Sequence, residues 1–151
     1  MRRTAVAGLS GLAAAGWLGC GSARQPVVPA DCVADPGAIA SALSQAPRPV
    51  TLPGGTPLSS CARDASGAAD LQNLGVVMVA VAEDLGSQVP GSDRAALELG
   101  YLVGTMRRGM AGDNGVHAEL ERRLEQAMPE GVAASRRAAY ERGLRAGAGA
   151  G

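Results

Sequence analysis

Apolar residues recur at helical spacing through most of the second half of the chain. Between residues 66 and 85 they fall every three or four positions, which is the period of one helix face. These positions are Leu71, Leu74, Met78, Val81 and Leu85. The run 74–82 is apolar on nearly every side, so we expect this helix to be central. Its β-branched residues leave a buried strand over 76–82 as the competing interpretation.

The same pattern predicts four more helices. The first opens at Asp35, a favourable N-cap residue, with Pro36 at the first helical position. It continues to about residue 46, where prolines follow. The other three are expected over residues 92–110, 116–128 and 131–145. Each of these stretches has apolar residues on one face. Asp113-Asn114-Gly115 follows the first, Pro129 follows the second, and only alanine and glycine follow the third.

These elements predict an all-α fold, a small bundle of four to five helices. Residues 50–58 contain Pro53-Gly54-Gly55 between short apolar runs, which indicates a hairpin or loop arm near the N-terminus. The connections between helices are short, so neighbouring helices should pack antiparallel. We assign the helical domain to residues 35–146, and a disordered tail of alanine and glycine to residues 147–151.

The N-terminus has the organisation of an export signal. Arg2 and Arg3 precede an uncharged stretch, residues 4–19, which is too short for a membrane span of roughly 20 residues. The stretch ends at Gly19-Cys20, where the chain resembles the bacterial lipoprotein class. Small and polar residues with Pro26 and Pro29 indicate a flexible tether over 20–34. The resemblance implies a signal peptide over 1–19 and a lipid on Cys20. It places the protein on the extracytoplasmic face of the cell membrane.

Two alternatives remain for this segment. Trp17 and Leu18 stand where lipoproteins usually carry leucine and a small residue. Cleavage after Ala23 would instead release a secreted, soluble protein. In a third interpretation, residues 4–19 form an ordinary buried helix, against which the terminal arginine pair argues.

The cysteine count agrees with export. Once Cys20 is acylated or removed, Cys32 and Cys61 remain, and an even number outside the cytosol favours a disulfide. Such a bond would close a loop of about 30 residues and contribute about 3.5 kcal/mol in the chain-entropy model. Metal binding by this cysteine pair would need further ligands.

Composition narrows the possible functions. All 14 positive charges are arginine, there is no lysine or phenylalanine, and the net charge is zero. Arginine in place of lysine, with abundant alanine and glycine, is typical of a GC-rich genome. Without a basic excess or many aromatic residues, nucleic-acid binding is not expected. Few large apolar residues are available for a core, which makes a stabilising disulfide more important.

Two patterns within the predicted helices need an interpretation. Gly100 and Gly104 form a GxxxG, which favours close helix packing inside a bundle over membrane dimerisation because the uncharged run around it is short. Arginine pairs fall on successive helices and form a candidate face for an anion or a partner protein: Arg107, Arg108, Arg122 and Arg123. The competing interpretation is solvated helix faces with local ion pairs, such as Glu119 with Arg123.

The sequence offers little catalytic chemistry. His117 and Glu121 share a helix face, but one histidine and one carboxylate are too few for a metal site. No GxSxG is present after the signal, no phosphate-binding loop, and no second histidine for a proton relay. We therefore expect no catalytic residues, no metal and no cofactor.

A second resemblance covers about thirty residues. The run Leu99–Gly104, Arg107-Arg108-Gly109 and Val116–Leu124 is similar to a pattern in small proteins of GC-rich actinobacterial lineages. It implies no particular activity. The sequence as a whole predicts a non-catalytic cell-envelope lipoprotein that interacts with another envelope protein or packs into an envelope assembly. The alternative is an exported helical module that binds a small ligand or an anion.

Overall fold

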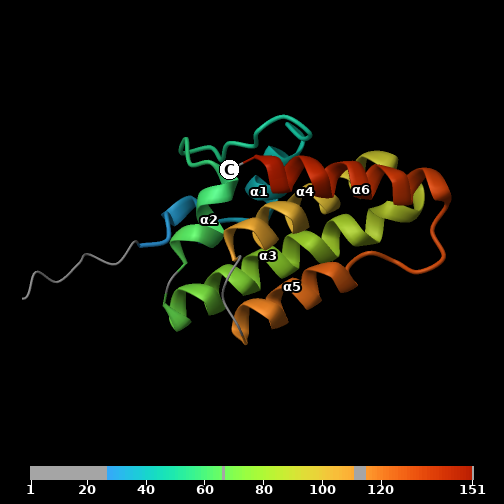
Figure 1. Ribbon diagram of the computed structural model, residues 1–151. Helices are drawn as coiled ribbons and strands as arrows, with labels where there is room; N and C mark the ends of the chain where they lie inside the picture. Colours follow the sequence, from blue (N-terminus) through green and yellow to red (C-terminus); the bar gives the residue numbers. More distant parts are fainter. Residues whose placement is uncertain (1–26, 66, 111–114, 151) are drawn as a thin grey trace, which may run out of the picture.

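The computed structural model describes residues 27–65, 67–110 and 115–150 (Figure 1). Within these ranges the chain forms six α-helices and two short 3-10 helices, and no strand. The elements are η1 (Ala30–Val33), α1 (Pro36–Leu43), α2 (Leu58–Asp64), α3 (Ala68–Gln88), η2 (Val89–Gly91), α4 (Asp93–Gly109), α5 (Val116–Gln126) and α6 (Ala134–Gly149). The all-α prediction is confirmed, and the competing strand over 76–82 is replaced by α3.

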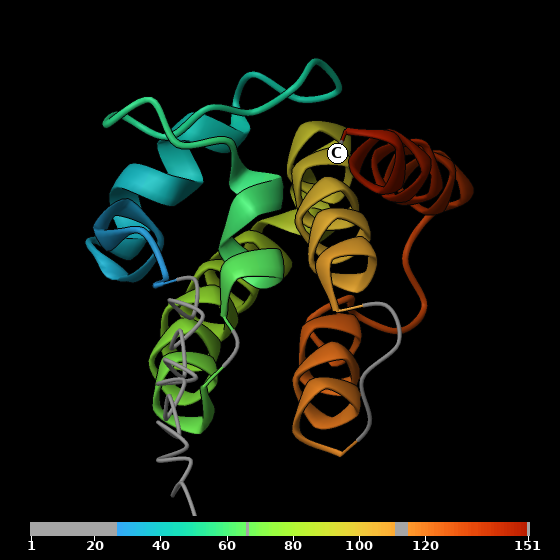
Figure 2. The same cartoon turned by 60° about the vertical axis from the view of Figure 1, so that its left-hand side comes forward.

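Helices α3 and α4 form the centre of the molecule. They run antiparallel and are joined directly by η2, as expected for a short connection (Figure 1). Helix α6 covers one side of α4, and the N-terminal arm of η1, α1 and α2 lies on the other (Figure 2). Helix α5 returns beside α3, so alternate helices of the bundle point the same way.

The core lies where these helices meet. Its largest side chains come from the apolar faces that the sequence predicted, including Leu74 and Met78 on α3 and Leu102 and Met106 on α4, all fully buried. The predicted caps are also present. Gly37 N–H donates to Asp35 Oδ1 at 3.0 Å. The Ser92 side chain caps α4 in the same manner.

Helix α2 is the element that sequence analysis missed, and it raises the count above the predicted four to five. It has only seven residues and follows Pro57 without a side-chain N-cap. Its residues LSSCARD have no clear apolar period, so propensity alone did not indicate a helix. Burial of Leu58 and Cys61 against the bundle stabilises it.

The arm is closed by a loop and a disulfide. Residues 50–58 form a turn with one isolated antiparallel bridge, between Thr51 and Pro57, so the predicted hairpin or loop is a loop. The predicted Cys32–Cys61 disulfide is confirmed, and both sulfur-bearing residues are fully buried. The Tyr101 hydroxyl on α4 accepts a hydrogen bond from Val50 N–H at 3.1 Å.

Part of the predicted tether belongs to the folded domain. Residues 30–33 form η1, which contacts α3, and Val28 and Cys32 are buried. The disulfide explains this difference because it fixes Cys32 to α2. The predicted signal peptide and Cys20 lie outside the described residues. None of the helices in the described ranges combines the length and apolarity that crossing a membrane requires.

Helices α4 and α6 run parallel and touch along their backbones. A Cβ atom on Gly100 would lie 2.0 Å from the carbonyl oxygen of Tyr140, and one on Gly104 would lie 2.2 Å from that of Leu144. Only glycine permits such an approach. The GxxxG of the sequence is therefore a helix-packing motif.

The other half of this contact comes from α6. A Cβ atom on Gly143 would lie 2.0 Å from the Leu97 carbonyl oxygen, and one on Gly147 would lie 2.1 Å from that of Tyr101. The predicted tail over 147–151 is corrected at this point, because α6 continues to Gly149. Gly147 is buried against α4, which supplies the packing that a run of alanine and glycine otherwise lacks.

Candidate functional site

An apolar hollow lies between α3 and α5. We call it the α3–α5 groove, and it has a volume of about 500 Å³. Its lining is mainly apolar, with Leu71, Gly75, Val76 and Val79 from α3 and Val116 and Leu120 from α5. Glu119 and Arg123 are its charged residues.

The groove opens because α3 and α5 diverge. Near the end of α3, a Cβ atom on Gly86 would lie 2.2 Å from the Ala127 carbonyl oxygen, so the two backbones touch there. Three turns earlier, a Cβ atom on Gly75 would meet only the Leu120 side chain, at 3.6 Å. The wider spacing at Gly75 leaves the apolar flanks of both helices uncovered.

Two valines of the groove are exposed to an unusual degree. Val76 on α3 is 68% exposed and Val116 on α5 is 58% exposed. A single exposed apolar residue on a protein surface is ordinary, but two that line the same apolar hollow form a patch. Sequence analysis missed this site because Val76 falls in a run that is apolar on every side. Only the position of α5 shows which side is left open.

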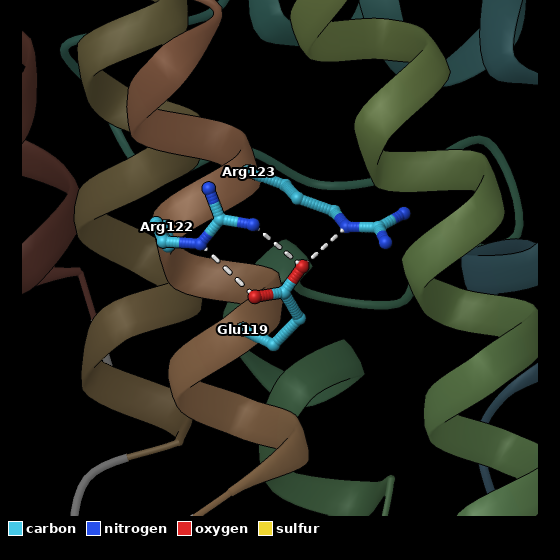
Figure 3. A network of polar contacts seen from close by, with 3 residues as sticks. All are labelled: Glu119, Arg122 and Arg123. Carbon is cyan, nitrogen blue, oxygen red and sulfur yellow. Dashed lines mark hydrogen bonds and ion pairs between the residues drawn. The ribbon is translucent and has the colours of Figure 1, made fainter.

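The charged residues beside the groove form a network on α5 (Figure 3). Glu119 Oε1 accepts a hydrogen bond from Arg122 Nη2 at 2.8 Å and another from Arg123 Nε at 2.8 Å. Arg122 Nε also donates to Glu119 Oε2 at 3.0 Å. The hydrogen bonds from Arg122 and then from Arg123 lower the pKa of Glu119 to about 2. The predicted local ion pair between Glu119 and Arg123 is confirmed.

A second hollow continues from the first along the same two helices. It has a volume of about 370 Å³, and Val79, Glu83, Arg122, Arg123, Gln126 and Ala127 line it. Both hollows share Val79 and Arg123. In Figure 3 the Arg123 side chain reaches from α5 toward α3, whereas the Arg122 guanidinium lies over α5 beside Glu119. Arg123 therefore lies where the two hollows join.

The structure does not bring the four candidate arginines onto one face. Arg107 makes ion pairs with Glu121 and Glu125, and so links α4 to α5. Burial lowers the pKa of Arg107, but its contacts with the two carboxylates outweigh this and raise it overall. Arg122 and Arg123 instead lie beside the groove.

Arg108 lies in a separate place. Its Nη1 donates to the Ala148 carbonyl oxygen at 2.6 Å, near the end of α6. Together with Arg63, Ser59 and Gly109 it lines a hollow of about 200 Å³ between α2 and α4. This second basic site was not anticipated, because nothing in the sequence pairs Arg63 with Arg108.

His117 is not part of a cluster of metal-ligating side chains within the described residues. It lies in the first turn of α5 and is half-buried, while Glu121 on the same face pairs with Arg107. Across the described ranges, no group of three or more His, Cys, Asp and Glu side chains is arranged to hold a metal ion.

Comparison of the chain with protein-family models, curated proteins and solved structures gives no significant match.

Proposed function

We propose that this protein is a non-catalytic cell-envelope lipoprotein, anchored through Cys20, whose helical domain binds another protein. The observation that carries the binding role is the α3–α5 groove, with Val76 and Val116 exposed on its two walls. Covering apolar surface with a partner is the main favourable contribution to protein association.

The thiol inventory supports the anchor. Cys32 and Cys61 are joined to each other, so Cys20 is the remaining cysteine of the chain. It follows an uncharged stretch of signal length and precedes the folded domain. The segment between Cys20 and η1 is the spacer that would hold the domain away from the membrane.

Intact mass spectrometry of the protein from its own membrane fraction tests the anchor. We expect a mass that corresponds to a chain starting at Cys20 with attached lipid, and loss of that adduct in Cys20→Ala. A soluble product that starts near Arg24 would contradict the anchor and favour the secreted form. Alkylation without reductant should find no free thiol.

Photo-crosslinking in cells tests the binding role. A photoreactive residue at position 76 should form an adduct with another protein, whereas one at Ala138 should not. Ala138 is exposed on α6 and lines neither hollow. Equal adducts at the two positions, or none at either, would contradict a partner at the groove.

The alternative function is an exported anion-binding module. The hollow that Ser59, Arg63 and Arg108 line is the observation that favours it. Arginine guanidinium groups recognise phosphate and carboxylate through paired hydrogen bonds. Calorimetric titration with inorganic phosphate would support this alternative if Arg63→Gln abolishes the binding heat while Arg137→Gln does not.

A further inference from the structure

We propose that the occupant of the α3–α5 groove is an amphipathic helix of a partner protein, with one carboxylate midway along the face that it turns toward the groove. This inference rests on the proposed binding role and specifies the chemistry of the partner.

The shape of the groove fits a helix. The α3 residues that line the two hollows run from Ala68 to Glu83, which is about 22 Å at 1.5 Å per residue. Both hollows are open along one side and bounded by the two parallel helices. A third helix of about 15 residues would match this length, with apolar residues at positions i, i+3 or i+4, and i+7 toward the groove.

The positive charge of Arg123 favours a partner helix that carries a carboxylate. Its Nε atom is held by Glu119, and in the described residues neither terminal nitrogen donates a hydrogen bond. A partner that covers the groove removes water from this guanidinium, at a cost that a carboxylate of the partner would offset. Glu119 fixes the arginine beforehand, so little side-chain conformational freedom is lost on binding.

The place of Arg123 along the groove decides against a fatty acid as the occupant. Leu71, Val76 and Val116 lie on one side of it, and the second hollow continues past Val79 to Ala127 on the other. A fatty acid carries its carboxylate at one end. The second hollow is lined largely by polar groups, among them Glu83, Arg122 and Gln126. An occupant that fills both hollows therefore needs its carboxylate midway along its length rather than at one end, which the side of an amphipathic helix provides.

Two designed peptides test the inference with the full-length protein. Each has about 15 residues and one leucine stripe. They differ in a single central stripe position, which is glutamate in one and lysine in the other. Fluorescence anisotropy should show that the glutamate peptide binds about tenfold more tightly. Arg123→Gln should remove most of this preference, and Arg137→Gln on α6 should leave it intact.

A matched pair of variants locates the binding surface. Val76→Glu on α3 should weaken binding of the glutamate peptide about tenfold or more, and Ala138→Glu on α6 should change it by less than about twofold. Both positions are exposed, so both variants should keep the circular dichroism spectrum and melting temperature of the parent protein.

Three results would overturn the inference. The first is equal binding of the two peptides, or binding that Val76→Glu leaves unchanged. The second is a dimer in sedimentation that Val76→Glu dissociates, which would make a second copy the occupant. The third is Val76-dependent binding to vesicles of equal parts phosphatidylcholine and phosphatidylglycerol, in preference to the glutamate peptide. If a crosslink forms at position 76 and any of these results is also found, the proposed function is retained. Only the proposal that the occupant is an amphipathic helix is then overturned.

Discussion

The Tyr101 hydroxyl joins the centre of the bundle to the N-terminal arm. The side chain is buried, and its oxygen accepts the hydrogen bond from Val50 N–H. Burial raises the pKa of Tyr101, and the hydrogen bonds lower it by less. The phenol is therefore uncharged in the folded protein near pH 7. No spacing rule relates positions 50 and 101, and the contact could not be predicted from the sequence.

Tyr101→Phe should therefore lower the free energy of unfolding by about 1–3 kcal/mol, because Val50 N–H would be left buried without an acceptor. Tyr140→Phe is the matched control, since the Tyr140 hydroxyl makes no hydrogen bond within the described residues. Urea denaturation of both variants measures the difference. Equal losses would show that the hydroxyl of Tyr101 contributes nothing specific.

Glu119 should make the stability of α5 depend on pH. Its pKa is about 2 in the folded protein and 4.5 for an unperturbed glutamate. The ionised form is favoured on folding, so this stabilisation is fully present above the unperturbed value and is lost as the pH falls toward the folded one.

Glu119→Gln should thus be less stable than the parent protein near neutral pH, and the gap should close as the pH approaches about 2. Urea denaturation across that range checks this. Glu141→Gln on α6 is the control, since no ion pair of Glu141 forms within the described residues and its effect should not vary in this way. A pH-independent gap for Glu119→Gln would contradict the assignment.

At the scale of elements, periodicity located the five longer helices, because each has an apolar face that packs against the core. It did not locate α2, whose burial depends on a disulfide to a distant residue. It also ended α6 too early. The second half of the glycine contact, Gly143 and Gly147, lies in a run of small residues that lacks the large side chains on which pattern analysis depends.

Gly104→Ala should destabilise the protein by about 1–3 kcal/mol or more, although alanine favours a helix by about 1 kcal/mol over glycine. The new methyl group would collide with the Leu144 backbone, which cannot move without separating the helices.

Gly149→Ala is the control on α6, because a Cβ atom there meets nothing within 4 Å. It should be neutral or slightly stabilising in thermal unfolding followed by circular dichroism. A similar loss of stability in both variants would contradict a specific contact between α4 and α6.

At the scale of the whole molecule, the arm depends on a covalent link. Cysteine arithmetic predicted this link correctly, since removing Cys20 left one possible pair. The groove could not be predicted in the same way. Its position results from the direction of α5 and its divergence from α3 between Gly86 and Gly75, and neither is encoded in a short motif.

Replacing both Cys32 and Cys61 by alanine should lower the free energy of unfolding by about 3.5 kcal/mol, because the bond closes a loop with a sequence separation of 29. The loss should appear in urea denaturation of the oxidised parent against the double variant. Adding reductant to the unfolding experiment should reproduce it in the parent and change nothing in the variant. A parent protein that is indifferent to reductant would contradict this.

The glycine contact between α4 and α6 also has an evolutionary consequence. The four positions share one interhelical distance, so a larger residue at any of them pushes the helices apart and relieves the others of their constraint. In diverged homologues of this chain, Gly100, Gly104, Gly143 and Gly147 should therefore be retained together or replaced together. An alignment would then show covariation between two segments some forty residues apart. The residues that line the groove would instead each vary with the residue of the binding partner that they contact.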